Sequence, residues 1–583
     1  MTTTDLPRRL SVKWLREMYL KKEITPKDVV CDIIHRANKN ADMNIWITPP
    51  AMIRIKPYLD RLKSLDPANS PLWGIPFAIK DNIDLAGVPT TAGCPEYAYT
   101  PKEHAAVVER LLAAGAIPLG KTNLDQFATG LVGTRSPYGE THNSLRKELI
   151  SGGSSSGSAV AVACGHAAFA LGTDTAGSGR VPAALNNLVG YKPSPGAWST
   201  KGVVPACASL DCVTVFTHSL EDALVVDRIA RGVEDTDPWS HRLPHPVPKL
   251  PQKLCLPKQP LYFFGPYANE YSKAWDAAVK RLKKLNIPIE YIDYHIFSQA
   301  AALLYEGPWV AERWADLGHF IESHPGAALP VTEQILRSGA AAGYDAASLF
   351  RAMHKLQSYK LEARKLLHNA VLALPTSGGT WTRDQVGLDP IGTNRDMGHY
   401  TNHCNLLDLC AIAIPADEAA FQIPFGITLF ALAENEDLIC GVADTFLNHT
   451  PSRTLPVSRK ETIFVAVCGL HMRGYPLEKQ MHDCGARFVH EAFTAPKYQL
   501  VKLPTIPAKP GLIRKQSGGA SIHLEIWEMP MEAFGSFVAF IPAPLGIGKV
   551  ELQDGSEVPG FICEAYAAID AEDITAFGGW INI

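Results

Sequence analysis

The residues with the clearest chemical potential are serines set among glycines in two neighbouring segments. Residues 152–157 read Gly-Gly-Ser-Ser-Ser-Gly, and residues 172–180 read Gly-Thr-Asp-Thr-Ala-Gly-Ser-Gly-Arg. The first segment lacks the Gly-Lys-Ser/Thr ending of a phosphate-binding loop, and a flexible linker would not run straight into the apolar residues 159–170, which are typical of a buried helix. Glycines around a serine let the backbone approach a small substrate and turn several N–H groups toward one point. This pattern favours an oxyanion hole beside a nucleophilic serine.

A serine at its ordinary pKa is a weak nucleophile and needs a base. Histidine is the usual base, but His166 lies in the apolar stretch, where a hydrogen-bonded core residue is the better interpretation. The alternative is Lys80, which ends the apolar run of residues 74–80. Burial disfavours a charged lysine, and lowering its pKa from about 10.4 to about 7 corresponds to roughly 4 to 5 kcal/mol. A surface ion pair of Lys80 with Asp81 or Asp84 fits the same spacing, which leaves both interpretations open.

Taken together, these segments resemble the amidase signature family, and the resemblance extends over roughly residues 10–450. The lysine segment, the Gly-Gly-Ser-Ser-Ser-Gly loop and the Gly-Thr-Asp-x-x-Gly-Ser-x-Arg block stand in the family's order. The resemblance implies an amide hydrolase with an α/β amidase signature fold, a central mixed β-sheet flanked by helices. It implies that Lys80 is the general base, that Ser154 is a bridging serine usually held by a cis peptide, and that Ser178 is the nucleophile.

The same resemblance assigns supporting residues around these three. Ser155 would be an accessory hydrogen-bonding serine. Asp174 and Arg180 match the family's supporting ion pair, for which a purely structural role is the simpler interpretation. An oxyanion-hole donor contributes about 3 to 4 kcal/mol in other hydrolases. The resemblance assigns this function to the backbone N–H groups of Thr175, Ala176, Gly177 and Ser178.

Three features resemble the allophanate hydrolase branch of the family more than its other branches. They are the segment at residues 129–139, the variant Gly-Ser-Gly-Arg-Val-Pro-Ala at residues 177–183, and a β-rich C-terminal region. Allophanate is urea bearing a carboxylate, so its pocket needs a cation, and arginine grips a carboxylate bidentately. The resemblance marks Tyr305, Arg313 and Gly130 as substrate-binding residues.

The local pattern around Arg313 gives a different picture without the resemblance. Pro308 is expected to begin a helix, with Tyr305 just ahead of it and Arg313 in its second turn. On that basis alone Arg313 is a solvated helix residue and Tyr305 is a core aromatic.

The C-terminal region predicts a second domain. Residues 450–461 are polar and contain prolines, and we expect them to link an amidase signature domain at residues 1–449 to a C-terminal domain at residues 462–583. The patterns predict strands at residues 462–467, 498–503, 522–527 and 537–541. Asp554-Gly555 predicts a hairpin with a type I′ turn.

This second domain resembles the α+β domain at the C-terminus of the allophanate hydrolase branch, a fold related to γ-glutamyl cyclotransferases. In that branch the first domain releases ammonia from allophanate, and the second is thought to decarboxylate the N-carboxycarbamate that remains. His471 falls on the proposed catalytic histidine. Glu478 stands where the branch predicts asparagine, so the chain departs from the branch pattern at this position.

The remaining patterns describe the rest of the first domain. Residues 11–38 carry two amphipathic helical patterns, and Pro26 is expected to begin the second helix. Short apolar strands such as residues 116–119 alternate with helical stretches, which indicates an α/β sheet. Residues 237–260 are rich in Pro, Lys and His without periodicity, which predicts a surface excursion.

Composition and charge argue against several other classes of protein. A chain of 583 residues predicts more than one folding unit. The net charge of −4 and the lack of a basic run interleaved with aromatics argue against a nucleic-acid partner. Without a secretory signal or an apolar run of about 20 residues, we expect a cytoplasmic protein that is not bound to a membrane. The 12 cysteines form no Cys-x-x-Cys pair, so buried thiols are favoured, and neither a metal nor a cofactor is expected.

Three alternatives stay open at this point. One is another small-amide hydrolase, such as a malonamidase-like enzyme, the second is a glutamine-dependent tRNA amidotransferase subunit, and the third is an inactive scaffold, against which the intact Lys80, Ser154 and Ser178 argue. No biotinyl Met-Lys-Met segment and no ATP-binding glycine loop is present. Allophanate would therefore come from a urea carboxylase, which we expect as a functional partner, and the family resemblance suggests a homodimer.

Overall fold

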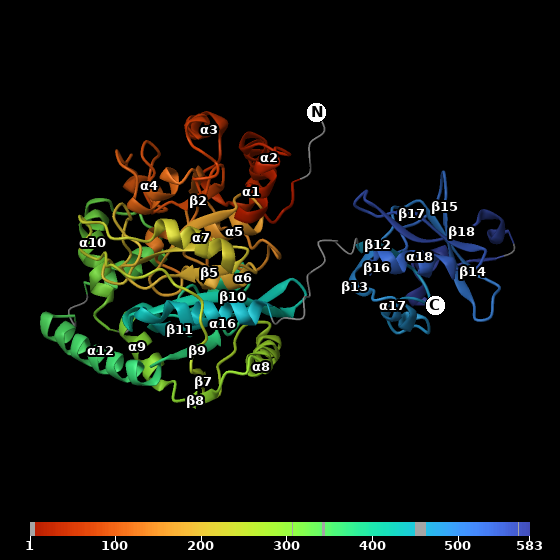
Figure 1. Cartoon of the computed structure of the whole chain (residues 1–583). Coiled ribbons are helices and arrows are strands. Elements are labelled where there is room, and N and C mark those ends of the chain that lie inside the picture. The colour runs from red at the N-terminus through yellow and green to blue at the C-terminus, as the bar shows by residue number, and fades with distance from the viewer. Residues whose placement is uncertain (1–5, 306, 341–343, 449–461, 570) are drawn as a thin grey trace. The chain divides into compact units, whose positions relative to one another are not determined.

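The computed structural model describes residues 6–305, 307–340, 344–448, 462–569 and 571–583, shown in Figure 1. The chain divides into two compact units, Met1–Thr450 and Pro451–Ile583. Each unit has its own β-sheets and its own apolar clusters. The linker predicted at residues 450–461 lies outside the described residues.

A mixed sheet of eleven strands runs through the first unit, in the order β1-β3-β2-β4-β6-β5-β10-β11-β9-β7-β8. Strands β3 and β4 lie parallel to β2, strands β8 and β9 lie parallel to β7, and the other neighbours are antiparallel. The predicted central mixed sheet is thus confirmed. The strands are β1 (Trp46–Thr48), β2 (Pro76–Lys80), β3 (Ile117–Thr122), β4 (Phe169–Asp174), β5 (Val189–Lys192), β6 (Cys212–Thr217), β7 (Lys253–Pro257), β8 (Ile289–Ile292), β9 (Ala370–Pro375), β10 (Leu409–Ala420) and β11 (Ile423–Leu432).

Helices flank this sheet, as predicted. In the described part of the chain, no helix is both long and apolar enough to span a lipid bilayer. The helices of the first unit are α1 (Val12–Leu20), α2 (Pro26–Lys39), α3 (Met52–Arg61), α4 (Ala106–Ala113), α5 (Ser156–Ala163), α6 (Val181–Leu185), α7 (Leu220–Ala230), α8 (Ala268–Lys283), α9 (His295–Tyr305), α10 (Val310–Ser323), α11 (Pro330–Ser338), α12 (Ala346–Leu366), α13 (Arg383–Leu388), α14 (Gly392–Met397), α15 (His403–Leu406) and α16 (Glu436–Asn448).

The sheet separates two apolar clusters because successive side chains of a strand point to opposite faces. In β11, Ile427, Leu429 and Ala431 belong to the larger cluster, whereas Phe430 and Leu432 belong to the second. The larger cluster takes side chains from α1 to α8 and from α16, and the second takes them from α9, α12 and α15. Both faces of the sheet are therefore covered by helices.

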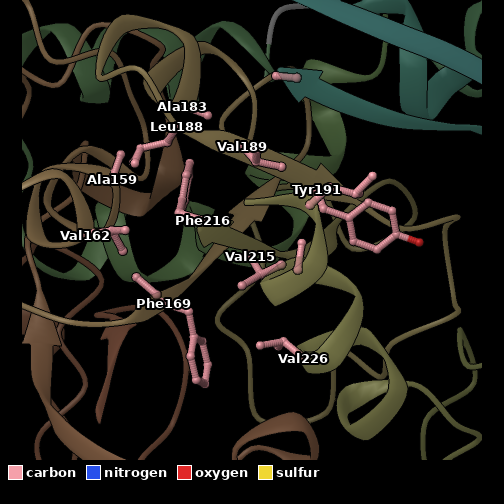
Figure 2. Packing of buried hydrophobic residues seen from close by; sticks show 14 of the residues in the cluster. Ala159, Val162, Phe169, Ala183, Leu188, Val189, Tyr191, Val215, Phe216 and Val226 are labelled. Atoms are coloured by element: carbon pink, nitrogen blue, oxygen red, sulfur yellow. The ribbon is translucent and has the colours of Figure 1, made fainter. Parts of the chain in front are cut away.

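Figure 2 shows the larger cluster where α5, α6 and α7 meet β4, β5 and β6. The side chains of Ala159, Val162, Phe169, Val215 and Phe216 are fully buried there. This buried apolar cluster includes side chains of α5 and β4, the two elements that adjoin the serine loops. Those loops therefore start from rigid elements.

Two patterns in the first unit were interpreted wrongly from the sequence. The helix predicted over residues 159–170 ends at Ala163, and Phe169 begins strand β4. An apolar run by itself does not distinguish a buried helix from a buried strand. The excursion predicted at residues 237–260 includes Lys253–Pro257, which is strand β7 of the central sheet. The helix expected from Pro26 is confirmed, with Thr25 as its cap.

The second unit is an α+β arrangement, as predicted. Its five-stranded sheet has the order β13-β16-β12-β18-β17, and its three-stranded sheet has the order β15-β14-β19. The helices are α17 (Glu478–Asp483) and α18 (Met531–Ala539). The strands are β12 (Thr462–Val467), β13 (Arg487–Phe493), β14 (Tyr498–Leu503), β15 (Lys509–Arg514), β16 (His523–Pro530), β17 (Leu545–Glu551), β18 (Glu557–Cys563) and β19 (Glu572–Asp573).

The strand predicted at residues 537–541 is wrong, because Phe537 lies inside helix α18. Phe534, Phe537 and Ile541 all pack in one apolar cluster of this unit, whereas Phe540 is 86% exposed. Spacings of three and four residues describe one face of a helix. The helical spacing therefore becomes visible only when Phe534, which precedes the predicted strand, is included.

The hairpin at Asp554-Gly555 is confirmed, since β17 and β18 pair antiparallel around it. The predicted turn type is wrong. Gly555 has φ +84°, but Asp554 is not among the residues with positive φ, and a type I′ turn requires both. The N–H of Gly555 donates to the carbonyl of Leu552 at 3.0 Å, which closes a type I turn followed by a left-handed glycine.

Replacing either of two glycines of the second unit with alanine should therefore change the free energy of unfolding of this unit, in opposite directions for the two positions. Gly555→Ala should lower the free energy of unfolding of this unit by about 1 kcal/mol or more, because a Cβ disfavours the left-handed conformation. Gly535 lies inside α18, and a Cβ added there would meet no other atom within 4 Å, so Gly535→Ala should raise that energy by up to about 1 kcal/mol. Hydrogen exchange of this unit in denaturant, measured on the full chain, checks both. Equal effects would contradict the turn assignment.

Candidate active site

Lys80 and the serine loop meet at the carboxyl edge of two parallel strands. Strand β2 ends in Lys80, and its parallel neighbour β4 contains Thr173 next to its own end. Nζ of Lys80 lies 2.7 Å from Oγ of Ser154 and 2.7 Å from Oγ1 of Thr173. Ser154 follows a cis peptide bond, Gly153–Ser154. The structure thus brings the predicted base and the predicted bridging serine into direct contact.

The environment of Lys80 disfavours its charged form. The side chain is fully buried. Burial lowers the pKa of Lys80 from its ordinary value to about 7, although the charges of Asp125, Asp211 and Asp174 act in the opposite direction. Near neutral pH a large share of the molecules therefore has an amine lone pair on Lys80.

The two carboxylates considered as surface partners of Lys80 are engaged elsewhere. Asp81 forms a fully buried ion pair with Lys121 at 3.0 Å. Asp84 accepts hydrogen bonds from the hydroxyls of Thr90 and Tyr99, both at 2.8 Å. The alternative of a surface ion pair is therefore wrong.

Ser178 lies in a turn that is built on the side chain of Asp174. Oδ1 of Asp174 accepts the N–H of Gly177 at 2.9 Å, and Oδ2 accepts the N–H of Gly179 at 3.0 Å. Gly177 has φ +137°, and a Cβ there would collide with the Thr401 side chain. The turn is therefore fixed by a carboxylate and accommodates only glycine at residue 177.

The ion pair predicted between Asp174 and Arg180 is present and is bidentate. Nε and Nη2 of Arg180 each donate to one carboxylate oxygen at 2.9 Å, and both side chains are fully buried. Burial alone would raise the pKa of Asp174, but the charge and hydrogen bonds of Arg180 outweigh it and hold this pKa below its ordinary value. The carboxylate that shapes the Ser178 turn therefore stays charged.

The four N–H groups predicted for the oxyanion hole are not equivalent. The N–H of Gly177 donates to Asp174, which corrects the prediction for this residue. Within the described ranges, the N–H groups of Thr175, Ala176 and Ser178 have no hydrogen-bond acceptor. The hydroxyl of Thr175 donates to Asp211, which fixes this part of the turn. Three donors are therefore available around Ser178.

Ser155 fastens the serine loop to strand β4. Its hydroxyl donates to the carbonyl of Thr173 at 3.1 Å and accepts the N–H of the same residue at 3.3 Å. His166 is a buried core residue, as predicted, with Nδ1 accepting from Trp46 at 3.3 Å. Burial lowers the pKa of His166 to about 4, so it is neutral at physiological pH. The histidine near the serine segments thus has no place in this site.

Arg313 is buried, against the expectation from local pattern alone. Its side chain is only 2% exposed, and Nη1 donates to Oγ1 of Thr129 at 2.8 Å. Gly130 follows Thr129 directly. The structure therefore places Arg313, on its helix, against the loop that contains Gly130. The third predicted substrate-binding residue, Tyr305, ends helix α9, and its side chain lies outside the described residues.

The helix containing Arg313 begins at Val310, so Arg313 closes its first turn, and the predicted start at Pro308 is wrong by two residues. Glu312 anchors this helix. Its carboxylate accepts the N–H and the hydroxyl of Ser209, at 2.7 and 2.6 Å, and the thiol of Cys207 at 2.9 Å. The position of Arg313 therefore depends on the loop at residues 206–211.

In the second unit, His471 faces a cavity of about 600 Å³. Nε2 of His471 lies 3.1 Å from Oε1 of Gln480, and its ring stacks on Phe561 with centroids 4.9 Å apart. Burial lowers the pKa of His471, while the hydrogen bond to Gln480 acts against that shift. The unexpected Glu478 accepts the N–H of Gly474 at 2.8 Å and so holds the turn after His471.

Comparison with known proteins gives two family matches that follow each other along the chain. Residues 28–440 match the family model described as amidase, and residues 463–583 match the model described as the allophanate hydrolase C-terminal domain. The chain belongs to the amidase family. The predicted resemblance is thus confirmed, together with the type of C-terminal domain.

Relatives of this amidase family chain include urea amidolyase of Saccharomyces cerevisiae, 41% identical over 573 residues. That match covers 92% of this chain and 31% of the relative, so the chain spans about a third of its length. The solved structure of allophanate hydrolase from Kluyveromyces lactis is 37% identical, with a TM-score of 0.72, and covers 100% of this chain and 99% of that one. One subunit of the glutamyl-tRNA(Gln) amidotransferase of Methylacidiphilum infernorum is 31% identical, over 74% of this chain and 92% of that protein.

Sequence reasoning missed two aspartates on which this amidase family site depends, and the first is the fully buried Asp125. Its carboxylate accepts the N–H groups of Val132, Gly133 and Arg135 at 3.3, 3.0 and 2.9 Å. Its own N–H donates to the carbonyl of Ser154 at 3.1 Å. Asp125 therefore joins the loop of Gly130 to the loop of Ser154, and no local pattern around a single aspartate reveals this.

Asp211 was missed for a similar reason. It accepts the N–H groups of Ala206 and Cys207 at 2.7 and 3.1 Å and the hydroxyl of Thr175. The loop at residues 206–211 thereby connects the Ser178 turn to the helix of Arg313. Across the described ranges, no group of three or more His, Cys, Asp or Glu side chains is positioned to hold a metal ion.

Asp125→Asn should move the titration of Lys80 to lower pH. The charge of Asp125 raises the pKa of Lys80, so its removal should lower that pKa below about 7. In the pH profile of labelling of Ser178 by a small fluorophosphonate, the fall in rate at acidic pH should then occur at a lower pH than in the wild type. Asp84→Asn is the control, because Asp84 is not among the charges that act on Lys80. An unshifted fall in rate in Asp125→Asn would contradict this electrostatic role.

Proposed function

We propose that this chain hydrolyses allophanate in urea degradation, with Ser178, Ser154 and Lys80 as its catalytic triad. The observation that supports this most directly is the 2.7 Å contact between Ser154 and a fully buried Lys80 whose pKa is about 7. Serine needs a base, and a lysine that is neutral near pH 7 can accept its proton. The similarity to the allophanate hydrolase of Kluyveromyces lactis supports the choice of substrate.

The first step is acyl transfer to Ser178. Oγ of Ser178 attacks the carbonyl carbon of the terminal amide, and its proton passes through the hydroxyl of Ser154 to Nζ of Lys80. The N–H groups of Thr175, Ala176 and Ser178 stabilise the negative charge on the carbonyl oxygen. The proton then returns to the leaving nitrogen, the C–N bond breaks and ammonia departs. Water hydrolyses the ester and leaves N-carboxycarbamate.

Arg313 and Gly130 are proposed to bind the carboxylate end of allophanate. A guanidinium matches the geometry of a carboxylate, and a buried one is worth more than a solvated one because water competes less. Gly130 directly follows Thr129, whose hydroxyl Arg313 contacts, and a Cβ at Gly130 would collide with the carboxylate of Asp125. Tyr305 is proposed as a third substrate contact from the family resemblance.

The second unit is proposed to decarboxylate N-carboxycarbamate at the cavity of His471. One carboxylate leaves as carbon dioxide, its bonding electrons stay on nitrogen, and nitrogen takes a proton. The carbamate that remains breaks down to ammonia and carbon dioxide. Across both steps, allophanate, water and one proton give two ammonia and two carbon dioxide. Histidine suits the proton transfer because its ordinary pKa is close to neutrality.

The source of allophanate is proposed to be a urea carboxylase that works with this chain in the cytoplasm. The supporting fact is that the relative in Saccharomyces cerevisiae is named urea amidolyase and is much longer than this chain. From the family resemblance we also propose a homodimer, with residues 450–461 linking a domain at residues 1–449 to one at residues 462–583.

Ser178→Ala should abolish ammonia release from allophanate while the fold persists, because Asp174 and Gly177 set the turn without the hydroxyl. Ammonia is measured with allophanate, malonamate and glutamine side by side. Wild-type preference for glutamine would favour an amidotransferase subunit, and preference for malonamate a different amidase. Substantial turnover by a folded Ser178→Ala would sink the assignment of the nucleophile.

Arg313→Met should reduce the use of allophanate far more than the use of biuret, which carries a neutral amide in place of the carboxylate. Loss of a charge-assisted bidentate contact is worth roughly 2 to 3 kcal/mol, or about 30- to 150-fold in kcat/KM. Biuret should lose less than about threefold. Arg351→Met, on the exposed face of α12, is the matched control. Equal losses on both substrates would show that Arg313 has only a structural role.

A further inference from the structure

The cavity of His471 contains a second basic residue, Lys509, at the start of strand β15. The charge of Lys509 acts on His471 and contributes to lowering the pKa of that histidine. In the described part of the chain Lys509 forms no ion pair, although Asp483 lines the same cavity. The cavity therefore contains a lysine that is not held in a direct ion pair in this part of the structure.

The position of Lys509 relative to His471 is fixed by its neighbours. Pro510 packs so closely on Gly469 that a Cβ on that glycine would collide with its ring. Gly469 lies two residues before His471, so the start of β15 is held against the turn of the histidine. On the other side, Phe561 and Phe537 contact the imidazole ring. Lys509 and His471 thus face one space from two rigid segments.

Most of the remaining lining is apolar, with Leu470, Phe537, Phe540, Ile541 and Leu545 among its residues. A dianion enters such a cavity only if a cation compensates for its lost hydration. His471 is largely neutral when the cavity is empty, because burial lowers its pKa. The lining residue that supplies positive charge is therefore Lys509.

We propose that Lys509 binds one carboxylate of N-carboxycarbamate and so holds the other carboxylate and the nitrogen against the apolar wall and His471. This inference rests on the proposed function of the second unit and names its carboxylate-binding residue. The bound dianion favours protonation of His471, since a nearby negative charge stabilises imidazolium. The C–N bond to the free carboxylate then breaks, carbon dioxide leaves, and nitrogen takes the proton from His471. The product is carbamate, still paired with Lys509.

The apolar wall has its own part in this step. A carboxylate facing apolar side chains loses hydration, whereas the transition state spreads the same charge over a departing carbon dioxide and the nitrogen. The wall therefore disfavours the starting carboxylate more than the transition state. Lys509 makes this arrangement possible because it retains the substrate through the carboxylate that does not react.

The test follows carbon-13-labelled allophanate by NMR during turnover of the full chain. Lys509→Met should prolong the lifetime of N-carboxycarbamate at least tenfold. Lys509→Arg should have a lifetime close to that of the wild type, because arginine keeps the positive charge. Lys479→Met is the matched control, because Lys479 is exposed on the neighbouring helix α17 and does not line the cavity. Release of the first ammonia should stay unchanged in all three variants, which serves as an internal control for the first unit.

A dianion of similar shape gives an independent measure of binding. Malonate replaces the N–H group of N-carboxycarbamate with CH2 and does not react by this route. It should prolong the intermediate in the wild type, and at least tenfold more malonate should be needed in Lys509→Met. His471→Gln should also prolong the intermediate but should keep the wild-type response to malonate, because that variant retains the cation.

The outcomes separate the two levels of the proposal. A normal lifetime in folded Lys509→Met, with a prolonged one in His471→Gln, would overturn the role of Lys509 alone. Normal lifetimes in both variants would overturn the catalytic role of the second unit. Failure of the wild type to release ammonia from allophanate would overturn the proposed function and this inference with it. Hydrogen exchange over β15 shows whether each variant is folded.

Discussion

Burial of the Lys80 amine is the constraint on which the candidate active site of the first unit depends. Desolvation lowers its pKa from 10.5 to about 7, a shift that corresponds to about 5 kcal/mol. Between those pH values the unfolded chain binds a proton at Lys80 that the folded protein does not. This group therefore makes the free energy of unfolding rise with pH across that interval. The three carboxylates that act on Lys80 limit the shift and keep the pKa where a general base is useful.

The same three carboxylates also build the loops. Asp174 accepts two N–H groups of the Ser178 turn, Asp125 accepts three in the loop after Gly130, and Asp211 accepts two from residues 206 and 207. Hydrogen bonds to backbone N–H groups compensate a buried carboxylate for lost water, so each loop is held in one conformation by a charge that also acts on Lys80. The geometry of the candidate catalytic loops and the pKa of Lys80 therefore depend on the same three carboxylates.

Sequence reasoning recovered the parts of this site that local pattern encodes. Lys80 ends an apolar run, and Ser154 and Ser178 stand among glycines, so local pattern singles them out, whereas their roles were assigned by the family resemblance. Arg313 was different, because its partner Thr129 is 184 residues away and its burial has no local signal. Glu312 and its partner Ser209 are 103 residues apart. In the second unit, residues 537–541 were misassigned because the helical spacing begins before the apolar run.

Under the proposed function, the chain uses two lysines in opposite ways, and their surroundings account for the difference. Lys80 is fully buried at the end of a central strand, where desolvation outweighs three carboxylates and the amine becomes a base. Lys509 is only partly buried at the start of a strand, beside a histidine that burial keeps neutral. One site needs a proton acceptor for a hydroxyl, and the other needs a fixed positive charge for a dianion. For Lys80 and Lys509, the difference in burial accompanies the difference in the chemistry proposed for each.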